Sequence, residues 1–481
     1  MREKRASHAA GRATSGLGVD LHLDLDGEGG LRAGLTRSLR EAVRGGRLPP
    51  GTRLPSSRHL AADLGIARNT VVDAYGDLVA EGWLTARQGA ATRVAERHGA
   101  SAAPVPLKPV DRGRPAPAPV GRHDLRPGRP DVSSFPRAAW LAAARRAVSA
   151  APAGSLAYGD PLGRPELRRA LAGYLSRVRG VRTEAECVVV CAGFSEVLGV
   201  LGELIAGPIA VEAYGLWLHR EALERGGVRT RPLPVDQHGA RVGELAHADA
   251  KAVLLTPAHQ FPTGAALHPS RRSAVVDWAR ADGGLVLEDD YDGEFRYDRQ
   301  PVGAVQGLDP DRVVYLGTAS KALAPGLRLS WMAVPRRLLD AVRAVKRESR
   351  SSVLDQLTLA DLLETGGYDR HVRAARLRYR RRRDLLVDTL GRRAPDCRVS
   401  GIAAGLHAVV QLPPGTEQSV VTAARWREVE LEGLGPYRHP ELLPDAGDPS
   451  LPRDALVVGY GAPTDRAFPS ALDALCDVLP C

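Results

Sequence analysis

The stretch Tyr315-Leu-Gly-Thr-Ala-Ser-Lys-Ala-Leu-Ala-Pro-Gly-Leu-Arg-Leu-Ser-Trp-Met332 decides how the larger part of this chain is interpreted. Residues 313–316 are β-branched or apolar in a row and predict a strand, which ends at Thr318. Lys321 then lies on a polar turn, before a second apolar run at 331–334. A lysine between two buried strands is desolvated and loses its proton easily, which is what a Schiff-base lysine needs.

Hydroxyl groups and one fixed positive charge surround this lysine. Thr318 and Ser320 precede it, and Arg328 follows a break in the chain at Pro325-Gly326. Hydroxyls together with a guanidinium are the chemistry of a phosphate cradle. Taken alone, the turn is equally consistent with a surface loop that carries an ordinary lysine.

Two earlier segments also place polar groups at the end of an apolar run. In Gly284-Leu-Val-Leu-Glu-Asp-Asp-Tyr-Asp-Gly-Glu-Phe295, a short buried strand is expected at 285–287, directly before three carboxylates. Buried carboxylates are costly unless paired, so one of them could pair with a protonated ring nitrogen, and Tyr291 could reach a ring hydroxyl. A metal site or a solvated acidic turn is the alternative. Leu254-Leu-Thr-Pro-Ala-His-Gln-Phe-Pro-Thr-Gly264 is a third strand that breaks into a polar turn. Three such ends suggest one pocket at the edge of an α/β sheet.

The motifs TPAHQFPTG, EDDYDGEF and GTASKALAPGLRLS, in this order and at this spacing, resemble the aminotransferase domain of MocR-type regulators, a branch of the fold-type-I pyridoxal-phosphate family. The resemblance implies that Lys321 forms a Schiff base with pyridoxal 5′-phosphate. It also implies that Asp289 pairs with the pyridinium nitrogen and Tyr291 with the ring O3′. An acid at the ring nitrogen keeps it protonated, which makes the ring an electron sink. The phosphate-binding residues that the resemblance implies are Thr318, Ser320 and Arg328.

Residues upstream extend the resemblance. Tyr158 matches a tyrosine that reaches the phosphate of the neighbouring subunit, so the resemblance implies a homodimer. Gly193, Phe194 and Ser195 form the turn into a helix, after a strand that is expected from Cys187 to Cys191. Backbone N–H groups at a helix N-terminus can bind phosphate, and Phe194 can offer only its backbone for this purpose.

Two positions depart from the family pattern. The family has VEDPGY, whose tyrosine stacks on the cofactor ring, where this chain has Val211-Glu-Ala-Tyr-Gly-Leu216. Leu216 therefore takes the stacking position, with Tyr214 and Trp217 close by, and which of the three covers the ring stays open. A late arginine that binds a substrate carboxylate in the family falls at Val457 in this chain.

Composition sets outer limits on the class of protein. A length of 481 residues predicts two or three domains, and 44% apolar residues is ordinary for a globular protein. No apolar run approaches the length needed to span a bilayer, and residues 1–8 lack the apolar segment of a signal peptide. Five cysteines in so long a chain indicate reduced thiols and a cytoplasmic location, and no metal site is expected. The net charge of +10 is consistent with an anionic partner.

The N-terminal part has the pattern of a helix-turn-helix. Leucine or valine recurs every four residues from Leu31 to Val43 and predicts a helix. Ser56 is the expected N-cap of a second helix that Gly65 ends, and a third helix follows directly. Two helices joined by a glycine-containing turn are typical of the DNA-binding helix-turn-helix. Residues 82–94 then predict a two-stranded wing around Gln88-Gly89.

From about Leu31 to Val94, with RLPSSRHLAADLGIARNTVVDAYGDLVAEGWL at its centre, the chain resembles the GntR-type winged helix-turn-helix. In such a motif the start of the recognition helix meets base edges. Arg68 could pair bidentately with a guanine and Asn69 with an adenine. The alternative for Arg58 and Arg68 is that both are merely solvated. The DNA-contacting residues that the resemblance implies are Arg58, Arg68, Asn69, Thr70, Gln88 and Gly89.

An arginine-rich segment, Arg373–Arg383, raises the question of a second DNA-binding surface. Leu377 and Leu385 at helical spacing instead predict a helix with one apolar side and solvated arginines. His407 lies near the start of a late strand and is expected to be structural rather than catalytic.

These observations predict an α/β multidomain protein. A winged helix-turn-helix domain is expected at 20–95, a proline-rich linker at 96–122, and an aminotransferase-like domain of fold type I at 123–481. The predicted function is transcriptional regulation by a protein that binds an operator in double-stranded DNA and pyridoxal phosphate. It would form a homodimer, contact no membrane, and sense a small molecule, either an amino compound or the cofactor itself. The alternative is a functional pyridoxal-phosphate-dependent aminotransferase whose DNA-binding module is incidental.

Overall fold

The computed structural model describes residues 23, 25, 29–87, 90–96, 122–297, 302–442 and 451–480. The chain divides into two compact units, Met1–Arg114 and Pro115–Cys481. Residues 1–22, most of the proline-rich linker, and Gln88 and Gly89 of the wing lie outside the described residues.

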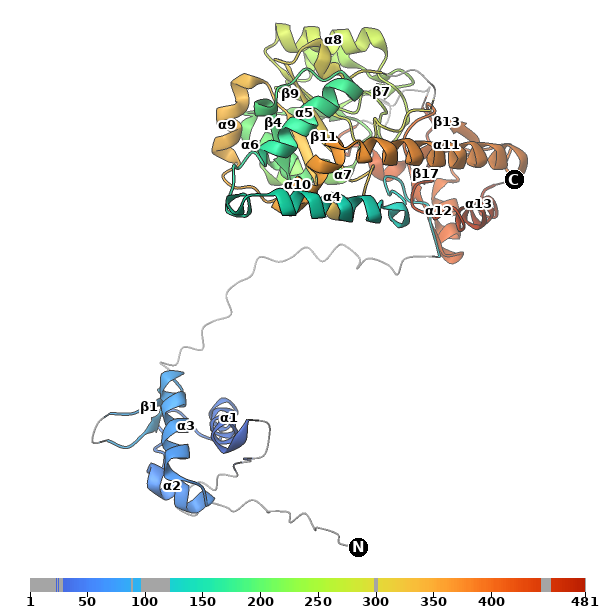
Figure 1. The fold of residues 1–481 in the computed structure, drawn as a ribbon. Coiled ribbons are helices and arrows are strands. Elements are labelled where there is room, and N and C mark those ends of the chain that lie inside the picture. The colour runs from blue at the N-terminus through green and yellow to red at the C-terminus, as the bar shows by residue number, and fades with distance from the viewer. Residues whose placement is uncertain are drawn as a thin grey trace. The chain divides into compact units, whose positions relative to one another are not determined.

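The smaller unit is a three-helix winged fold (Figure 1). Its elements are α1 Gly30–Arg44, α2 Ser57–Leu64, α3 Arg68–Ala80, β1 Leu84–Thr85 and β2 Arg93–Val94. The predicted cap of α2 is confirmed, because the Ser56 hydroxyl accepts a hydrogen bond of 3.2 Å from the His59 N–H. Gly65 ends the same helix at a φ of 67°, a left-handed conformation that favours glycine.

A small apolar core and two ion pairs hold these helices together. Leu35, Leu60, Val71 and Leu78 are buried in one cluster that extends to Leu84 of the wing. On the surface, Arg32 of α1 makes a bidentate contact with Asp77 of α3, and Arg40 does the same with Glu81. Exposed pairs of this kind contribute about 0.2–1 kcal/mol each, so the packing of the cluster carries most of the stability.

The larger unit is built on a seven-stranded sheet in the order β4-β12-β11-β10-β9-β5-β6. Its strands are β4 Val188–Cys191, β5 Ile209–Glu212, β6 Thr230–Leu233, β9 Ala252–Leu255, β10 Leu285–Asp289, β11 Val313–Thr318 and β12 Ser330–Ala333. Only β12 runs antiparallel to its two neighbours. The α-helices that precede the C-terminal part of this unit are α4 Arg137–Ala150, α5 Pro165–Arg179, α6 Phe194–Leu204, α7 Trp217–Arg225, α8 Pro269–Ala281, α9 Leu339–Val345, α10 Val353–Glu364 and α11 Gly367–Arg393.

Both faces of this sheet are buried, which explains the continuous apolar runs in the sequence. On β11, Val314 packs in an apolar cluster with residues of α6, whereas the next residue, Tyr315, packs with residues of α5 and α11. Strand β10 is longer than predicted: it continues through Glu288 and Asp289, so the carboxylate of Asp289 lies on the last residue of a buried strand.

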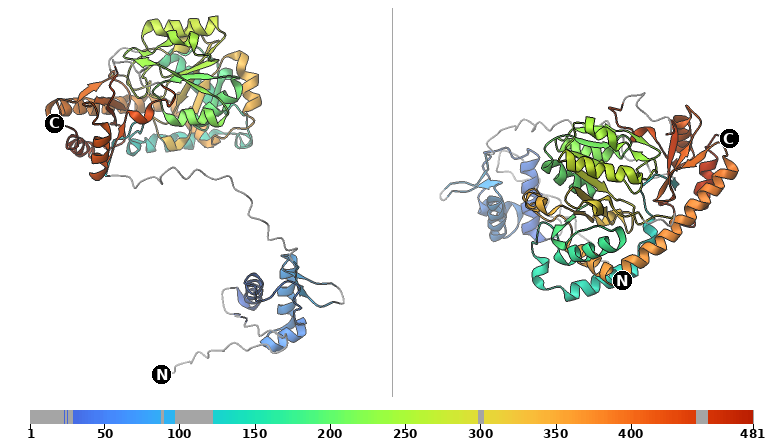
Figure 2. Two further views of the ribbon diagram at one scale, coloured as in Figure 1. Left: turned by 180° about the vertical axis from the view of Figure 1, so that it is seen from behind. Right: turned by 90° about the horizontal axis from the view of Figure 1, so that it is seen from above.

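A smaller four-stranded sheet forms the C-terminal part of this unit, in the order β13-β14-β17-β16. Its strands are β13 Arg398–Ser400, β14 His407–Gln411, β16 Glu432–Gly433 and β17 Ala455–Gly459, and its helices are α12 Glu417–Trp426 and α13 Phe468–Cys476. The short pairs β7 Val235–Asp236 with β8 Gly239–Ala240, and β3 His123–Asp124 with β15 Val429–Glu430, complete the unit. Figure 2 shows α11 leading along the unit into this C-terminal part.

The prediction for the arginine-rich helix α11 is partly wrong. Leu377 and Leu385 are exposed, at 60% and 39%, and the buried side carries Tyr379 and Leu386 instead. Arg382 is also buried and bonds to the carboxylates of Asp131 and Asp465. The spacing of apolar residues therefore predicted the helix but not which side of it packs.

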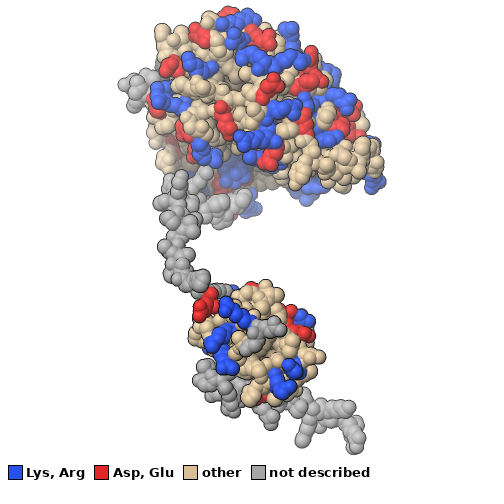
Figure 3. All heavy atoms as spheres, turned by 90° about the vertical axis from the view of Figure 1, so that its left-hand side faces the viewer, with Lys and Arg blue, Asp and Glu red and all other residues tan. Residues whose placement is uncertain are grey.

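Positive and negative side chains are mixed on the face of the larger unit that Figure 3 shows. On the face that Figure 3 shows, lysine and arginine side chains alternate with aspartate and glutamate. Among the described helices, none is both long and apolar enough to cross a bilayer.

Candidate functional site

A cavity of about 420 Å³ opens where the three predicted strand ends meet. Strands β9, β10 and β11 are parallel neighbours, so their carboxyl ends lie at the same edge of the sheet. This is the edge at which open α/β sheets bind ligands. The residues used below that line the cavity are Gly128, Arg129, Phe194, Glu212, Leu216, Trp217, His219, Arg220, Thr256, Phe261, Asp289, Tyr291, Thr318, Ser320, Lys321 and Tyr437.

Lys321 lies on the turn after β11 and points its amine into this cavity. Its Nζ donates a hydrogen bond of 2.6 Å to the backbone carbonyl of Gly128. Burial lowers the pKa of the Lys321 amine, while the carboxylates of Asp292 and Asp289 act in the opposite direction. A buried amine with a lowered pKa is the form that attacks an aldehyde.

Asp289 provides the test of whether these residues fit pyridoxal phosphate. Its side chain is 3% exposed, and its Oδ1 has no hydrogen-bond partner among the described residues. Burial, reinforced by the Asp290 carboxylate, raises the pKa of Asp289 well above its usual value. A buried acceptor without a partner costs about 1–3 kcal/mol, and a protonated ring nitrogen would supply both the missing donor and a compensating charge. The site therefore fits the cofactor, which when bound supplies a ring that withdraws electrons from a substrate carbon.

Arg328, which does not line the cavity, lies beside the N-terminus of α6. The Arg328 guanidinium donates a hydrogen bond of 3.1 Å to the carbonyl of Ala192, and a Cβ on Gly193 would lie 2.4 Å from its Nη2. Gly193 has a φ of 96°, so both backbone conformation and space call for glycine. The first turn of α6 begins at Phe194, and Ser195 is exposed on it. A guanidinium beside free helix N–H groups is suited to a phosphate.

The hydroxyls on the lysine turn are already linked to one another. Thr318 Oγ1 and Ser320 Oγ lie 3.0 Å apart, and the Ser320 N–H donates to Thr318 Oγ1 at 3.1 Å. Both residues line the cavity, so the structure brings all the predicted residues of the lysine turn except Arg328 to its wall.

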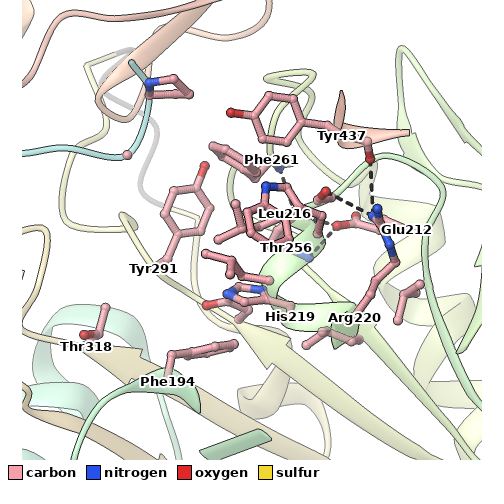
Figure 4. A pocket seen from close by; sticks show the side chains of 18 of the residues that line it. Phe194, Glu212, Leu216, His219, Arg220, Thr256, Phe261, Tyr291, Thr318 and Tyr437 are labelled. Carbon is pink, nitrogen blue, oxygen red and sulfur yellow. Dashed lines mark hydrogen bonds between the residues drawn. The ribbon is translucent and has the colours of Figure 1, made fainter. Parts of the chain in front are cut away.

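His219 lines the cavity beside the residues that are candidates for covering the ring. His219, which the sequence analysis did not single out, packs against the Phe194 ring at a tilt, with centroids 4.5 Å apart (Figure 4). Burial, together with the charges of Lys321 and Arg220, lowers the pKa of His219 to about 3, so the imidazole is neutral. Leu216 and Trp217 also line the cavity, whereas Tyr214 does not.

Glu212 forms a buried network on the opposite wall from Tyr291 (Figure 4). Its carboxylate accepts hydrogen bonds from the N–H and hydroxyl of Thr256, at 3.1 and 2.5 Å, and from the Gln260 amide at 3.2 Å. Burial raises the pKa of Glu212 to about 7 despite these bonds. The sequence analysis placed Glu212 in the segment Val211–Leu216 but did not predict that its carboxylate is buried.

Tyr291 meets a carboxylate and an imidazole that the sequence analysis passed over. Its hydroxyl lies 3.1 Å from Nδ1 of His259, and the same nitrogen lies 2.9 Å from Oδ2 of Asp292. His407 stacks against His259 with centroids 4.8 Å apart. Ligand-type atoms of His259, Asp292 and His407 lie within 4.8 Å of one another, the nearest approach to a metal site among the described residues. The absence of a metal site stays a prediction.

Two further positions from the sequence analysis, Tyr158 and Val457, do not line the cavity. Tyr158 is fully exposed. Val457 is fully buried on β17, in an apolar cluster that includes Tyr437 and is packed by Leu216 and Phe261 from the cavity wall. An apolar residue thus does lie behind the cavity at this position.

In the smaller unit, the predicted DNA-contacting residues lie at the start of α3. Arg68 and Asn69 are exposed and Thr70 is half-buried, while Arg58 is exposed on α2. The Arg68 Nε lies 3.5 Å from the Ser57 hydroxyl, which keeps the guanidinium near the N-terminus of α2. The start of the recognition helix meets base edges in such motifs, and DNA contact by these residues stays a prediction.

Comparison with known proteins agrees with both units. Residues 31–94 match the model of the bacterial regulatory proteins of the gntR family, and residues 128–429 match that of aminotransferase class I and II. The HTH-type pyridoxine biosynthesis transcriptional regulator PdxR of Corynebacterium glutamicum is 35% identical, over 84% of this chain and 88% of its own. The probable rhizopine catabolism regulatory protein MocR of Rhizobium meliloti is 30% identical, over 86% and 87%.

Solved structures support the fold of the larger unit. An archaeal alanine:glyoxylate aminotransferase matches with a TM-score of 0.67 and 23% identity, over 74% of this chain and 90% of its own. The kynurenine aminotransferase of Pyrococcus horikoshii matches with a TM-score of 0.66 and 21% identity, over 75% and 91%. The chain therefore belongs to the MocR-type HTH transcriptional regulators, in which a GntR-type DNA-binding domain is joined to a pyridoxal-phosphate-binding domain of the aminotransferase class I and II fold.

Proposed function

We propose that this regulator changes its affinity for an operator when pyridoxal phosphate occupies the cavity around Lys321, and that the cofactor itself, or an amine without an α-carboxylate, is the effector. Val457 is the observation that carries this proposal. A bidentate arginine at that position would clamp a substrate carboxylate, and valine cannot. The name of the PdxR relative, a regulator of pyridoxine biosynthesis, favours the cofactor as effector.

The cations that do line the cavity are engaged elsewhere. Arg220 is 9% exposed, and its guanidinium donates to the backbone carbonyls of Gly215, Tyr437 and Arg438 at 3.2–3.4 Å. Arg129 bonds to the Asp124 carboxylate at 2.9 Å. Neither guanidinium can bind a substrate carboxylate in place of an arginine at position 457 without losing these bonds. The carboxylate of a common α-amino acid would therefore be positioned poorly for reaction.

Within the cofactor site, we assign Lys321 as the Schiff-base residue, Asp289 as the partner of the ring nitrogen and Tyr291 as the partner of O3′. The phosphate would be held by Thr318, Ser320 and Arg328 together with the backbone of Gly193, Phe194 and Ser195. Tyr158, exposed in its own subunit, would complete the phosphate site of a second copy, which makes the active species a homodimer.

For DNA, we propose that Arg68 and Asn69 read bases in the major groove, and that Thr70 and Arg58 position the domain on phosphates. Gln88 and Gly89 remain candidates for a wing contact. The net charge of +10 favours binding to a polyanion in general, whereas specificity would come from these few base contacts.

The experiment begins with sequencing genomic fragments retained by the full-length protein, which defines an operator. Its affinity for that DNA is then measured by fluorescence anisotropy with and without pyridoxal phosphate. A cofactor-dependent change in affinity that Lys321→Ala abolishes supports the proposal. Equal affinity with and without the cofactor, in a protein that demonstrably binds it, contradicts it.

The second candidate function is catalytic transamination. It is favoured by the matches to aminotransferases, including the aromatic-amino-acid aminotransferase 1 of Thermococcus litoralis at 25% identity over 61% of this chain. Steady turnover of an amino acid together with a keto acid, without any effect of the cofactor on DNA affinity, would favour this function.

A further inference from the structure

We propose that Asp292, held in place by His259, is a positioning residue that keeps the Schiff-base nitrogen of Lys321 protonated at neutral pH and keeps the Tyr291 phenol neutral. The inference deepens the proposed function, because it rests on Lys321 being the residue that joins the cofactor. It concerns two side chains that lie behind the cavity wall and that the cofactor assignments above do not use.

The first step is the hydrogen-bonded chain itself. Asp292 is 2% exposed and His259 is 3% exposed. The His259 Nδ1 lies 2.9 Å from Asp292 Oδ2 and 3.1 Å from the Tyr291 hydroxyl, and the Tyr291 hydroxyl also bonds to Asp292. An ionised carboxylate only accepts hydrogen bonds, so Nδ1–H and the phenol O–H both donate to Asp292.

The second step is that the pair cannot move away. Gly405 has a φ of 69°, and a Cβ on it would lie 2.3 Å from Asp292 Oδ2 and 2.4 Å from Cε1 of His259. On the other face, the His407 ring packs against His259. The His407 Nε2 lies 3.1 Å from the Pro262 carbonyl, to which it donates. Burial lowers the pKa of His407 well below its usual value, so this ring adds no positive charge.

The third step is the charge that Lys321 meets. Asp292 and Asp289 favour the protonated amine, and Arg129 opposes it. His219 and His407 are neutral neighbours. Because Asp289 has an unpaired oxygen suited to the ring nitrogen, its charge would be compensated at that end of the ring. The Asp292 charge would then be the one left to stabilise a cation at the lysine.

The fourth step concerns Tyr291. Burial and the Asp292 carboxylate raise the pKa of the Tyr291 phenol well above its usual value. A neutral phenol has one proton, so Tyr291 cannot donate to Asp292 and to an anionic ring oxygen at the same time. Asp292 therefore sets which hydrogen-bonding role Tyr291 plays toward the ring oxygen, without touching the ring.

The test is a pH titration of the visible absorption band of the full-length protein loaded with pyridoxal phosphate. Asp292→Asn removes the negative charge and leaves the side-chain shape. Because the loss of an opposite charge disfavours the protonated form of a cation, the titration midpoint should fall below that of the wild-type protein. Asp236→Asn is the matched control. Like Asp292, Asp236 is a buried aspartate, but it bonds to Arg271 and does not line the cavity.

Two variants of His259 keep the test decisive if Asp292→Asn fails to fold or to bind the cofactor. His259→Leu removes a hydrogen-bond partner of Asp292, and should lower the midpoint by less than the aspartate variant. His259→Gln can still donate, and should restore the wild-type midpoint. Unchanged midpoints in loaded, folded variants would reduce the pair to a packing role and overturn the proposal. The titration uses no DNA, so a failure here is distinct from a failure of cofactor-dependent DNA binding.

Discussion

The Nζ of Lys321 donates a hydrogen bond of 2.6 Å to the backbone carbonyl of Gly128, which lies 193 residues earlier in the chain. Gly128 has a φ of 72°, and a Cβ there would lie 3.4 Å from Nζ. A glycine at the start of the larger unit thus allows the backbone to close over the lysine. This contact fixes the position of the Lys321 amine in the cavity.

Lys321→Ala should abolish the visible absorption of the cofactor-loaded protein and the incorporation of the cofactor on borohydride reduction. The physical reason is that only a lysine amine in the cavity can form the imine. Circular dichroism should show an unchanged fold, because the change deletes atoms next to a cavity. A variant that still retains a borohydride-reducible cofactor would show that another lysine forms the bond.

Gly193→Ala should weaken binding of pyridoxal phosphate by about 1–3 kcal/mol, the usual cost of a strained backbone position. Its Cβ would meet the Arg328 guanidinium at 2.4 Å, and its φ of 96° disfavours alanine. Fluorescence titration of the apoprotein measures the affinity. Gly199→Ala is the control, because a Cβ at that position of α6 meets nothing within 4 Å. Equal affinities for the two variants would remove Arg328 and Gly193 from the phosphate site.

Arg68→Ala should cost about 1–3 kcal/mol on the operator and relax preference at one base pair, as the loss of a bidentate guanine contact does. Affinity should also fall steeply with salt, because neutralised phosphates release counterions. Anisotropy titrations on operator and random DNA, at two salt concentrations, provide the measurement. An equal loss on both DNAs would make Arg68 a phosphate contact.

Glu212→Gln should flatten the pH dependence of stability between about pH 4.5 and 7. Burial raises the pKa of Glu212 from 4.5 to about 7, so the folded state binds this proton more tightly than the unfolded state. The stabilisation is complete below pH 4.5 and is lost as the pH rises through 7. A shift of this size corresponds to about 3 kcal/mol.

Urea denaturation across this pH range, with the exposed Glu203→Gln as control, gives the free energy of unfolding. The Glu212→Gln variant should have a larger free energy of unfolding at pH 8 than the Glu203→Gln control. A wild-type pH dependence in the Glu212 variant would mean that another buried acid, such as Glu288 or Glu294, dominates this range.

Common α-amino acids should convert the bound cofactor to its amine form slowly or not at all. Without an arginine at position 457, the carboxylate is not clamped and the Cα–H bond is not aligned, and alignment of this kind can carry about 7–11 kcal/mol of a barrier. Absorption spectra recorded while the holo-protein is mixed with a panel of amino acids provide the measurement. Rapid conversion by ordinary amino acids would establish the enzymatic alternative instead.

The arrangement of the cavity shows how far the sequence could be taken. Three apolar runs that end in polar turns were enough to predict adjacent strand ends, because parallel strands share an edge. His219 and Asp292 were not singled out, since a lone histidine or a fourth acid carries no spacing signal. On α11, leucine spacing predicted the wrong buried side, because Arg382 is stabilised by two carboxylates that lie 251 and 83 residues away along the chain.

By itself, the sequence determined the two kinds of domain, the winged helix and the larger α/β unit, together with the lysine, acid and arginine of the cofactor motifs. These depend on local features: the spacing of apolar residues, capping residues such as Ser56, and short motifs whose residues lie close together in the sequence. Tertiary structure alone decided that Gly128 closes over Lys321, that His219 covers Phe194, and that Val457 is packed behind the cavity. Such contacts depend on burial and on partners far apart in the chain, and neither quantity is a property of a local stretch of residues.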